Sequence, residues 1–174
     1  MTEPGAPSPA EWGAPRTREI SWHDPLRTAQ ALLGLTGLAA MQAIRDGRVA
    51  PPPIAAHFAF AVTGVSLGEV EFSCRPDESA YNPIGMVHGG LVCTLLDTVI
   101  GCAVHTTLPA RVAYTSIELK VNYLRAVHAE RGALTARGWV TKPGRRVAFA
   151  DAEARDGDGK LVATGSGSCL IMPG

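Results

Sequence analysis

The sequence shows no surplus of either charge. Its 16 Lys and Arg are balanced by 16 Asp and Glu, and charged residues make up only 18% of the 174 positions. Nucleic acids are bound through a surplus of cations, so we do not expect nucleic acid as a partner. Hydrophobic residues make up 46% of the chain, which is enough for one folded domain and excludes disorder over most of its length.

Long apolar segments and targeting signals are also missing. The most apolar stretch near the N-terminus, residues 31–41, has only eleven residues and is interrupted by Thr36, whereas a membrane-spanning helix needs about 20. The first residues contain Glu3 and a mixture of Pro, Gly and Ala rather than a basic segment followed by an apolar run. We therefore expect a soluble, cytoplasmic protein without a signal peptide and without a membrane partner.

The cysteines form no metal-binding pattern. No two of them are arranged as C-x-x-C, and with the histidines they give no ligand set at zinc spacing. Since their neighbours are apolar, we expect small buried hydrophobic residues and no metal site. The four cysteines are Cys74, Cys93, Cys102 and Cys169.

Proline divides the chain into three parts. Eight of the 13 prolines precede residue 54. Residues 1–22 mix Pro, Gly and Ala without periodicity, which predicts a mobile tail. Residues 23–53 are predicted to form an N-terminal helical extension and a proline linker, and residues 54–174 the main domain.

The extension carries the signals of a single helix. Asp24 is a capping residue, Pro25 suits the first helical position, and Asp46-Gly47 supplies a stop. Apolar residues between them recur at near-helical spacing, so one amphipathic helix is predicted over 25–46. The run Pro51-Pro52-Pro53 cannot continue this helix and is predicted to be a stiff connector.

In the main domain, apolar and polar residues alternate as they do in strands, except in one apolar segment. Strands at 57–64 and 69–74 are predicted to form a hairpin. After His88-Gly89-Gly90, apolar residues lie nearly all round a predicted helix that ends before Pro109, which is typical of a buried helix. Four further strands are predicted, at 114–123, 132–141, 145–155 and 161–172. This order predicts an α+β fold in which a six-stranded antiparallel sheet wraps around one central helix, with an extra N-terminal helix.

Asp97 is the residue that this pattern does not explain. With neutral histidines it is the only formally charged residue between His88 and Pro109, and it lies in the middle of the buried helix. A carboxylate in apolar surroundings costs several kcal/mol unless it is paired or faces a wet cavity. Two interpretations are open: a structural ion pair, with Arg125 as one candidate partner, or a nucleophile or general base in a cleft.

A glycine-rich turn precedes the same helix, in the motif Asn82-x-x-Gly85-x-x-His88-Gly89-Gly90. The N–H groups of a first helical turn have no partners within the helix, and the helix dipole suits them to a developing oxyanion. By itself His-Gly-Gly also fits an ordinary tight turn. Followed eight residues later by a lone acid in an apolar helix, it indicates a catalytic site.

Three segments together resemble the hotdog-fold acyl-CoA thioesterases, in particular the branch of the phenylacetate-degradation and 4-hydroxybenzoyl-CoA thioesterases. The segments are YNPIGMVHGGLVCTLLDTVIGCAV, YTSIELKVNYLRAV and LVATGSGSCLI. The resemblance covers about residues 51–172, and the helix at 25–46 is similar to an extension found in part of the family. It implies a hotdog fold and hydrolysis of an acyl-CoA thioester. It implies no cofactor, because coenzyme A is part of the substrate.

The resemblance also implies roles for individual residues. The acid in the central helix would be the catalytic carboxylate, which falls on Asp97 as general base or nucleophile. The glycine after the histidine would supply the oxyanion-hole N–H, which falls on Gly89. Asn82 would orient the thioester or the water, and His88 would fix the turn.

Other positions match less regularly. Some members place a hydroxyl one turn after the acid, where this chain has Gly101, and others use a serine in the following strand, where Ser116 stands. Gly90, Tyr123 and Arg125 are candidates to border the cleft. The basic residues around the Pro143-Gly144 turn are candidate partners for the phosphates of coenzyme A, although exposed turns commonly carry cations. They are Lys142, Arg145 and Arg146.

The geometry of the predicted helix indicates how many chains form one active site. At about 1.5 Å per residue, Gly89 and Asp97 lie about 12 Å apart along one helix. A thioester carbonyl must lie about 3 Å from both its oxyanion donor and its attacking group. If both residues are catalytic, each comes from a different chain, and the active enzyme is at least a homodimer. The family resemblance implies sites at the dimer interface and dimers often paired into homotetramers.

Two other functions on the same fold are weighed. An enoyl-CoA hydratase resembles a different pattern, with Asp and His about five residues apart, and here His105 stands eight positions after Asp97. A non-catalytic acyl-CoA-binding sensor or scaffold stays the open alternative, although sensors of that type carry a DNA-binding module that this chain lacks. The acyl group is open between aromatic and medium-chain. Its pocket is expected to depend on the packing of Val92, Leu96 and Ile100.

Overall fold

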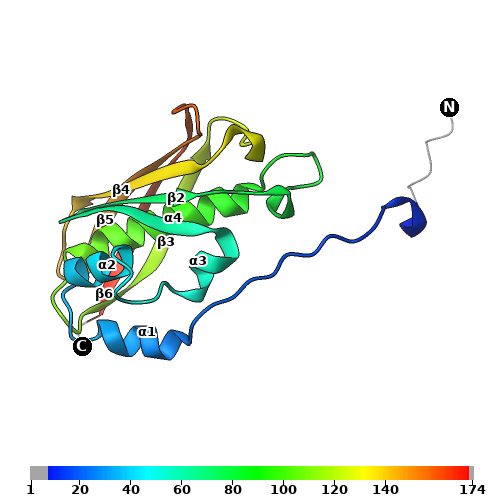
Figure 1. Cartoon of the computed structure of the whole chain (residues 1–174). Helices are drawn as coiled ribbons and strands as arrows, with labels where there is room; N and C mark the ends of the chain where they lie inside the picture. Colours follow the sequence, from blue (N-terminus) through cyan, green and yellow to red (C-terminus); the bar gives the residue numbers. More distant parts are fainter. Residues whose placement is uncertain (1–7, 173–174) are drawn as a thin grey trace.

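The computed structural model describes residues 8–172, and in it one six-stranded antiparallel sheet curls around a long central helix (Figure 1). The strand order is β1-β2-β4-β5-β6-β3. The strands are β1 (Phe60–Ser66), β2 (Glu69–Cys74), β3 (Ala113–Tyr123), β4 (Leu134–Lys142), β5 (Val147–Arg155) and β6 (Leu161–Met172), and the central helix is α4 (Gly89–Thr106). The predicted α+β hotdog fold is confirmed.

Helix α4 is buried by the concave face of the sheet. Leu95, Leu96 and Val99 are fully buried on it, together with the apolar side chains of β2, β4, β5 and β6. The helix has the length and apolar composition of a membrane span, with mean hydropathy 1.4 over 18 residues, but 56% of that window is buried inside the sheet. An apolar composition of this kind is equally what a helix buried in a protein core requires.

The predicted single helix over 25–46 is wrong, because the chain forms two helices there. They are α1 (Pro25–Leu32) and α2 (Gly37–Arg45). Thr36 caps α2 by accepting a hydrogen bond from the Ala39 N–H. A Cβ on Gly37 would lie 1.7 Å from the His105 carbonyl oxygen, so α2 begins where its backbone packs against the end of α4. This contact between distant segments decides the break.

The predicted connector and first strand also need correction. Pro53 begins a short helix, α3 (Pro53–Phe58), since proline is well suited to the first helical turn. His57 is therefore helical, and the strand predicted to begin at residue 57 begins instead at Phe60. Ala59, with a φ of 52°, makes the turn between them.

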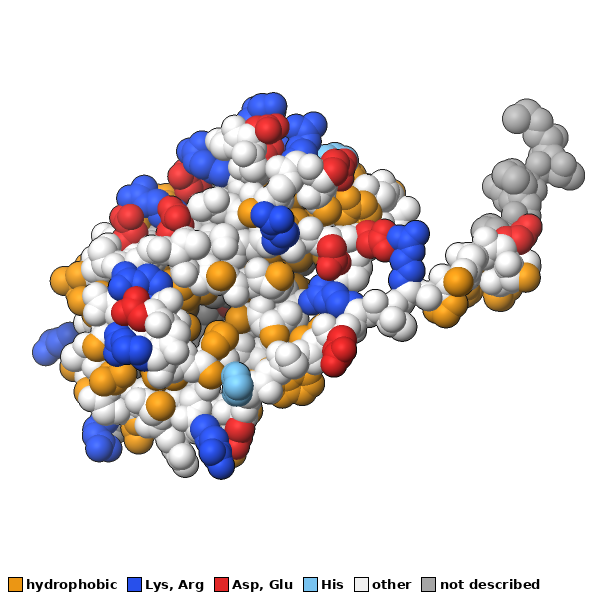
Figure 2. Space-filling view, in the orientation of Figure 1, with side chains coloured by type: hydrophobic (Ala, Val, Ile, Leu, Met, Phe, Trp, Pro, Cys, Tyr) orange, Lys and Arg blue, Asp and Glu red, His pale blue; other side chains and the backbone are white. Residues whose placement is uncertain are grey.

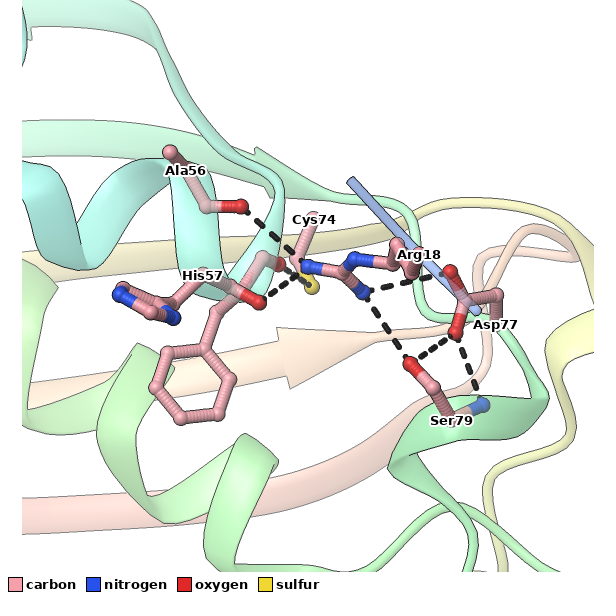
Figure 3. A network of polar contacts seen from close by, with 7 residues as sticks. Arg18, Ala56, His57, Cys74, Asp77 and Ser79 are labelled. Atoms are coloured by element: carbon pink, nitrogen blue, oxygen red, sulfur yellow. Dashed lines mark hydrogen bonds and ion pairs between the residues drawn. The ribbon is translucent and has the colours of Figure 1, made fainter. Parts of the chain in front are cut away.

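The part of the segment before α1 that contains Arg16 and Arg18 contacts the domain, whereas the short helix at Pro9–Glu11 projects away from it (Figure 1). The Arg18 guanidinium donates to the His57 carbonyl at 2.5 Å and to the Ser79 hydroxyl at 3.2 Å, and it pairs with Asp77 at 3.3 Å (Figure 3). Arg16 pairs with Glu78. Residues 1–7 of the predicted mobile tail lie outside the described residues. The limits of the three predicted parts of the chain stay a prediction.

Strand β3 forms one edge of the sheet and contains a bulge. It pairs with β6 from Ala113 to Tyr123, with a shift in register between Ser116 and Glu118. Most of its side chains are exposed, including Ile117 with 54% of its surface and Tyr123 with 55%. An eleven-residue edge strand with exposed apolar side chains is a surface on which another strand can pair.

Candidate active site

The Asp97 carboxylate is held by one side chain from the edge strand. Its Oδ1 accepts a hydrogen bond from the Ser116 hydroxyl at 2.8 Å. Asp97 is half-buried, and no ion pair within residues 8–172 includes it, so the pairing with Arg125 is not seen. A half-buried carboxylate oriented by a hydroxyl keeps its second oxygen for a substrate or a water molecule.

The bulge in β3 aims Ser116 at the helix. Before the bulge, Tyr114 and Ser116 face α4; after it, Leu119, Val121 and Tyr123 do. Side chains of a regular strand alternate, so positions separated by an odd number of residues face opposite ways. The extra residue shifts this alternation by one, and both ends of β3 therefore contact α4.

The turn before α4 leaves one backbone donor without a partner. The His88 imidazole caps the helix, its Nδ1 accepting the Gly90 N–H at 2.8 Å, and the Leu91 N–H bonds to the His88 carbonyl at 3.0 Å. The Gly89 N–H donates to none of the residues that the structure describes. His88 therefore occupies the Gly90 donor and leaves Gly89 as the N–H available to an oxyanion at this helix end.

Tyr123 closes the other side of Gly89. Its hydroxyl donates to the Gly89 carbonyl at 3.1 Å, and a Cβ on Gly89 would lie 3.1 Å from the tyrosine ring. Partial burial, together with the nearby Cys93 thiol, raises the pKa of Tyr123 above its usual value. The tyrosine therefore stays protonated at neutral pH. Its hydroxyl can hold the Gly89 carbonyl in place, and with it the adjacent Gly89 N–H.

The oxygen and the nitrogen of the Asn82 side-chain amide differ in their contacts. Its Oδ1 accepts hydrogen bonds from the Ile84 N–H at 3.0 Å and the Met86 N–H at 3.3 Å, which shapes the turn. Among the described residues nothing accepts from its amide nitrogen, which leaves a donor for a carbonyl oxygen. Four of the predicted residues line one open cavity of about 350 Å³: Asn82, Gly89, Tyr123 and Arg125.

The predicted phosphate partners lie at the opposite end of the helix. Lys142 ends β4 and Arg145 follows the Pro143-Gly144 turn, where an open cavity of about 480 Å³ is also lined by Leu108, just beyond α4. None of the ion pairs in the described part of the chain uses Lys142, Arg145 or Arg146. Within one chain these cations are therefore remote from Gly89.

The residues expected to size the acyl pocket are placed differently. Val92, Leu96 and Ile100 are at most 2% exposed and pack against the sheet. Val92 lines the cavity beside Gly89, whereas Leu96 and Ile100 are enclosed in the core. Sequence reasoning missed the opposite face of α4, where Thr98 and Cys102 line a cavity under the N-terminal helices. Their only sequence signal is their small size at helical spacing. Within residues 8–172, no group of three or more His, Cys, Asp or Glu side chains could hold a metal ion.

Comparison with known proteins identifies the family of this chain. Residues 84–163, which include Gly89, Asp97 and Ser116, match the family model of the thioesterase superfamily. A thioesterase family protein from Silicibacter pomeroyi is 30% identical, with a TM-score of 0.67, and the match covers 76% of this chain and 98% of that one. The chain belongs to the thioesterase superfamily.

Relatives in the superfamily extend the comparison. A phenylacetic acid degradation-related protein from Ralstonia eutropha JMP134, provisionally named a thioesterase, is 28% identical with a TM-score of 0.69, covering 75% of this chain and 98% of its own. A protein from Halobacterium salinarum, provisionally named an esterase, is 40% identical over 96 residues, covering 51% of this chain and 62% of its own. The match thus spans about three fifths of the length of that curated relative. A Streptococcus mutans protein solved with acetyl-CoA bound shares the fold, with 21% identity and a TM-score of 0.60 over 66% of this chain and 89% of its own.

Proposed function

We propose that this protein hydrolyses the thioester bond of an acyl-CoA, releasing a free acid and coenzyme A. The observation that carries the proposal is the combination on α4 of a hydroxyl-oriented carboxylate at Asp97 and an unoccupied N–H at Gly89. Membership of the thioesterase superfamily supports the reaction type. The acetyl-CoA held by the Streptococcus mutans protein supports the substrate class.

In the proposed reaction, each change in charge is accommodated by one group of the site. Asp97 takes a proton from a water molecule, whose oxygen attacks the thioester carbon, or attacks that carbon itself to form an anhydride that water then cleaves. The carbonyl oxygen becomes an oxyanion held by a Gly89 N–H and the positive end of its helix. The C–S bond breaks, and the thiolate of coenzyme A takes up a proton as it leaves. Ser116 orients the carboxylate, and Asn82 donates its amide hydrogens to the thioester oxygen.

One chain does not bring these groups to the same carbonyl. Gly89 and Asp97 stand eight residues apart on α4, or about 12 Å along its axis. We propose that the site forms between two chains that pair through the free edge of β3. Pairing of this kind satisfies the unpaired backbone groups of an edge strand and covers Ile117, which is 54% exposed.

The contacts of β3 favour one register for this dimer. Ser116 marks the position of Asp97 along the strand, and Tyr123 marks the position of Gly89. An antiparallel pair centred near Leu119 and Lys120 would set Ser116 of one chain opposite Tyr123 of the partner subunit. That register brings the acid of each chain toward the oxyanion donor of the other, which is what the reaction requires.

The cations at the Pro143-Gly144 turn are proposed to meet the phosphates of coenzyme A. Arg145 and Arg146 are exposed and have no carboxylate partner within residues 8–172, so their charge is available. In a dimer with antiparallel edge strands, this end of one chain lies toward the Gly89 end of the other. Pairing of such dimers into a homotetramer would cover further surface of the sheets.

Release of thiol from a panel of acyl-CoA esters tests the reaction. The panel includes acetyl-, hexanoyl-, octanoyl- and phenylacetyl-CoA, with a coloured thiol reagent reporting free coenzyme A. Turnover that depends on Asp97 is the expected result. Tight binding of the esters by the unmutated protein without release of thiol would overturn hydrolysis in favour of an acyl-CoA-binding sensor or scaffold.

A further inference from the structure

A cavity of about 220 Å³ lies between the N-terminal helices and α4. Its roof comes from α2 and α3 and its floor from α4, and strands β1 and β2 also line it. On the face that carries α2 and α3, the space-filling view shows a hollow bordered by hydrophobic side chains (Figure 2). The residues used below are Met41 and Ile44 on α2, Ile54 and Ala55 on α3, and Thr98 and Cys102 on α4.

The floor of this cavity is continuous with the reactive face of α4. Ten of the 18 residues of α4 are buried, and the other eight are half-buried and lie along one half of the helix as a strip. The strip contains Gly89, Gly90, Cys93, Thr94, Asp97, Thr98, Cys102 and His105. Successive residues of a helix are about 100° apart, so Thr98 flanks Asp97 on the side toward the cavity. Apart from Asp97 and His105 the side chains of this strip are small, and Thr98 and Cys102 belong both to the strip and to the cavity floor.

The lining of the cavity carries no free charge. Of the described residues that line it, Arg45 alone is charged, and its Nε donates to the Asp46 carboxylate at 2.8 Å. The Thr98 hydroxyl donates to the Thr94 carbonyl at 2.8 Å and so offers no free donor. Burial raises the pKa of the Cys102 thiol to about 12, and the Asp97 carboxylate adds to the rise, so the thiol stays neutral.

We propose that this cavity holds the hydrocarbon end of the acyl group, so that α2 and α3 select the substrate. The inference rests on the proposed hydrolysis and narrows it to uncharged acyl groups. A cavity of about 150 Å³ binds a benzene ring, so 220 Å³ accommodates one ring or an unbranched chain of about six to nine carbons. Acyl groups that end in a carboxylate are excluded, because burying an unpaired charge there is costly.

Filling the cavity from its roof tests the proposal. Ala55 is half-buried on α3, lines the cavity and lies outside the catalytic machinery. In Ala55→Phe, turnover of acetyl-CoA should stay within about twofold, while kcat/KM for octanoyl- and phenylacetyl-CoA should fall at least about tenfold, since each buried methylene contributes about fourfold in affinity. Ala56→Phe is the matched control, because Ala56 is half-buried on the same helix and does not line the cavity.

A second variant works in the opposite direction. Ile54 is 44% exposed and lines the same cavity, so Ile54→Ala enlarges it with little risk to folding. It should move the preferred acyl chain to greater length. Unchanged chain-length profiles in both Ala55→Phe and Ile54→Ala, with folding confirmed by thermal melts, would overturn the proposal while leaving hydrolysis intact.

Binding separates this proposal from the proposed reaction. Calorimetry with S-methyl-, S-hexyl- and S-octyl-CoA, which cannot be hydrolysed, should show affinity that grows with chain length in the unmutated protein and levels off in Ala55→Phe. Absence of turnover with any ester, combined with this binding pattern, contradicts hydrolysis but supports the acyl site. Equal chain-length dependence in both proteins contradicts the acyl site.

Discussion

Ser116 and Tyr123 both reach α4 from a single strand, although they stand seven residues apart and would face opposite sides of a regular strand. Ser116 donates to the Asp97 carboxylate at 2.8 Å and Tyr123 to the Gly89 carbonyl at 3.1 Å. The bulge between Ser116 and Glu118 makes both contacts possible. One strand therefore orients the proposed acid and the proposed oxyanion turn together.

Removing the acid should abolish most of the activity. We expect Asp97→Asn to keep the fold and to lose at least about a hundredfold in kcat, as for loss of a general base or nucleophile. Asp158→Asn, an exposed turn residue, is the control and should stay near the unmutated rate. Near-normal turnover, with mass spectrometry showing that the new amide has not hydrolysed, would assign Asp97 a structural role.

A single turnover of the unmutated protein in heavy-oxygen water separates general-base catalysis from covalent attack, because covalent attack labels the Asp97 side chain first.

Ser116 should act as a positioning residue. Hydrogen bonds to charged groups contribute about 1.5–3 kcal/mol, so Ser116→Ala should lower kcat by about ten- to a hundredfold with little change in KM. Ser116→Thr retains a hydroxyl and should recover most of the rate. Equal losses in the alanine and threonine variants would show that packing at the bulge, rather than the hydroxyl, is what matters.

Mixed dimers should recover activity if two chains share each site. Asp97→Asn and Gly89→Pro homodimers should each be nearly inactive, since loss of one oxyanion donor costs about a hundred- to a thousandfold. Refolding an equal mixture should give about half mixed dimers, each with one intact site, and hence about a quarter of the unmutated activity.

The control for Gly89→Pro is Gly89→Ala, which presses on the Tyr123 ring in the same place but keeps the N–H. It should retain more activity than the proline variant. No recovery in the mixture, with mixed dimers verified by native mass spectrometry, would confine both residues to one chain.

Two of the thiols should resist alkylation at neutral pH. Burial raises the pKa of Cys74 and of Cys102 to about 12, so the thiolate fraction at pH 8 is about one in ten thousand, against about one in four for an ordinary thiol. Iodoacetamide at pH 8 should therefore spare both residues in the folded protein and modify all four cysteines after denaturation. Their labelling in the folded state should rise as the pH increases toward 12. Rapid modification at pH 8 would show that the core opens readily.

Arg18 should hold the N-terminal segment against the domain. Its guanidinium contacts two backbone carbonyls, a hydroxyl and a carboxylate. Within residues 8–172, Arg27 pairs only with Asp24, at 3.9 Å, and its side chain is 88% exposed. Arg18→Ala should lose about 1 kcal/mol and about 2–4 °C in melting temperature, and the segment before α1 should become easier to cleave with chymotrypsin, which cuts after Trp22 and whose site neither variant removes. Arg27→Ala should change neither. Identical melting and cleavage in the two variants would mean that the contacts of Arg18 do not hold the segment.

The sequence alone determined the features that depend on neighbours along the chain. Alternation placed the strands from β2 to β6 to within a few residues, and the apolar run identified α4 as the core helix. His88-Gly89-Gly90 marked the start of that helix, and Asp97 stood out because a lone charge in an apolar helix requires a reason.

Only the tertiary structure decided the features that depend on contacts between distant segments. The break between α1 and α2 follows from the packing of Gly37 on His105, and the cavity under α3 exists only once the N-terminal helices cover α4. From the residues alone, Asp97 was open between an ion pair with Arg125 and a role in a cleft, and the family resemblance offered Ser116 as a candidate. The bulge in β3 brings the Ser116 hydroxyl to the Asp97 carboxylate. Periodicity describes which face a residue takes within one element, but one extra residue in a strand reverses that face, and sheet pairing decides where the extra residue lies.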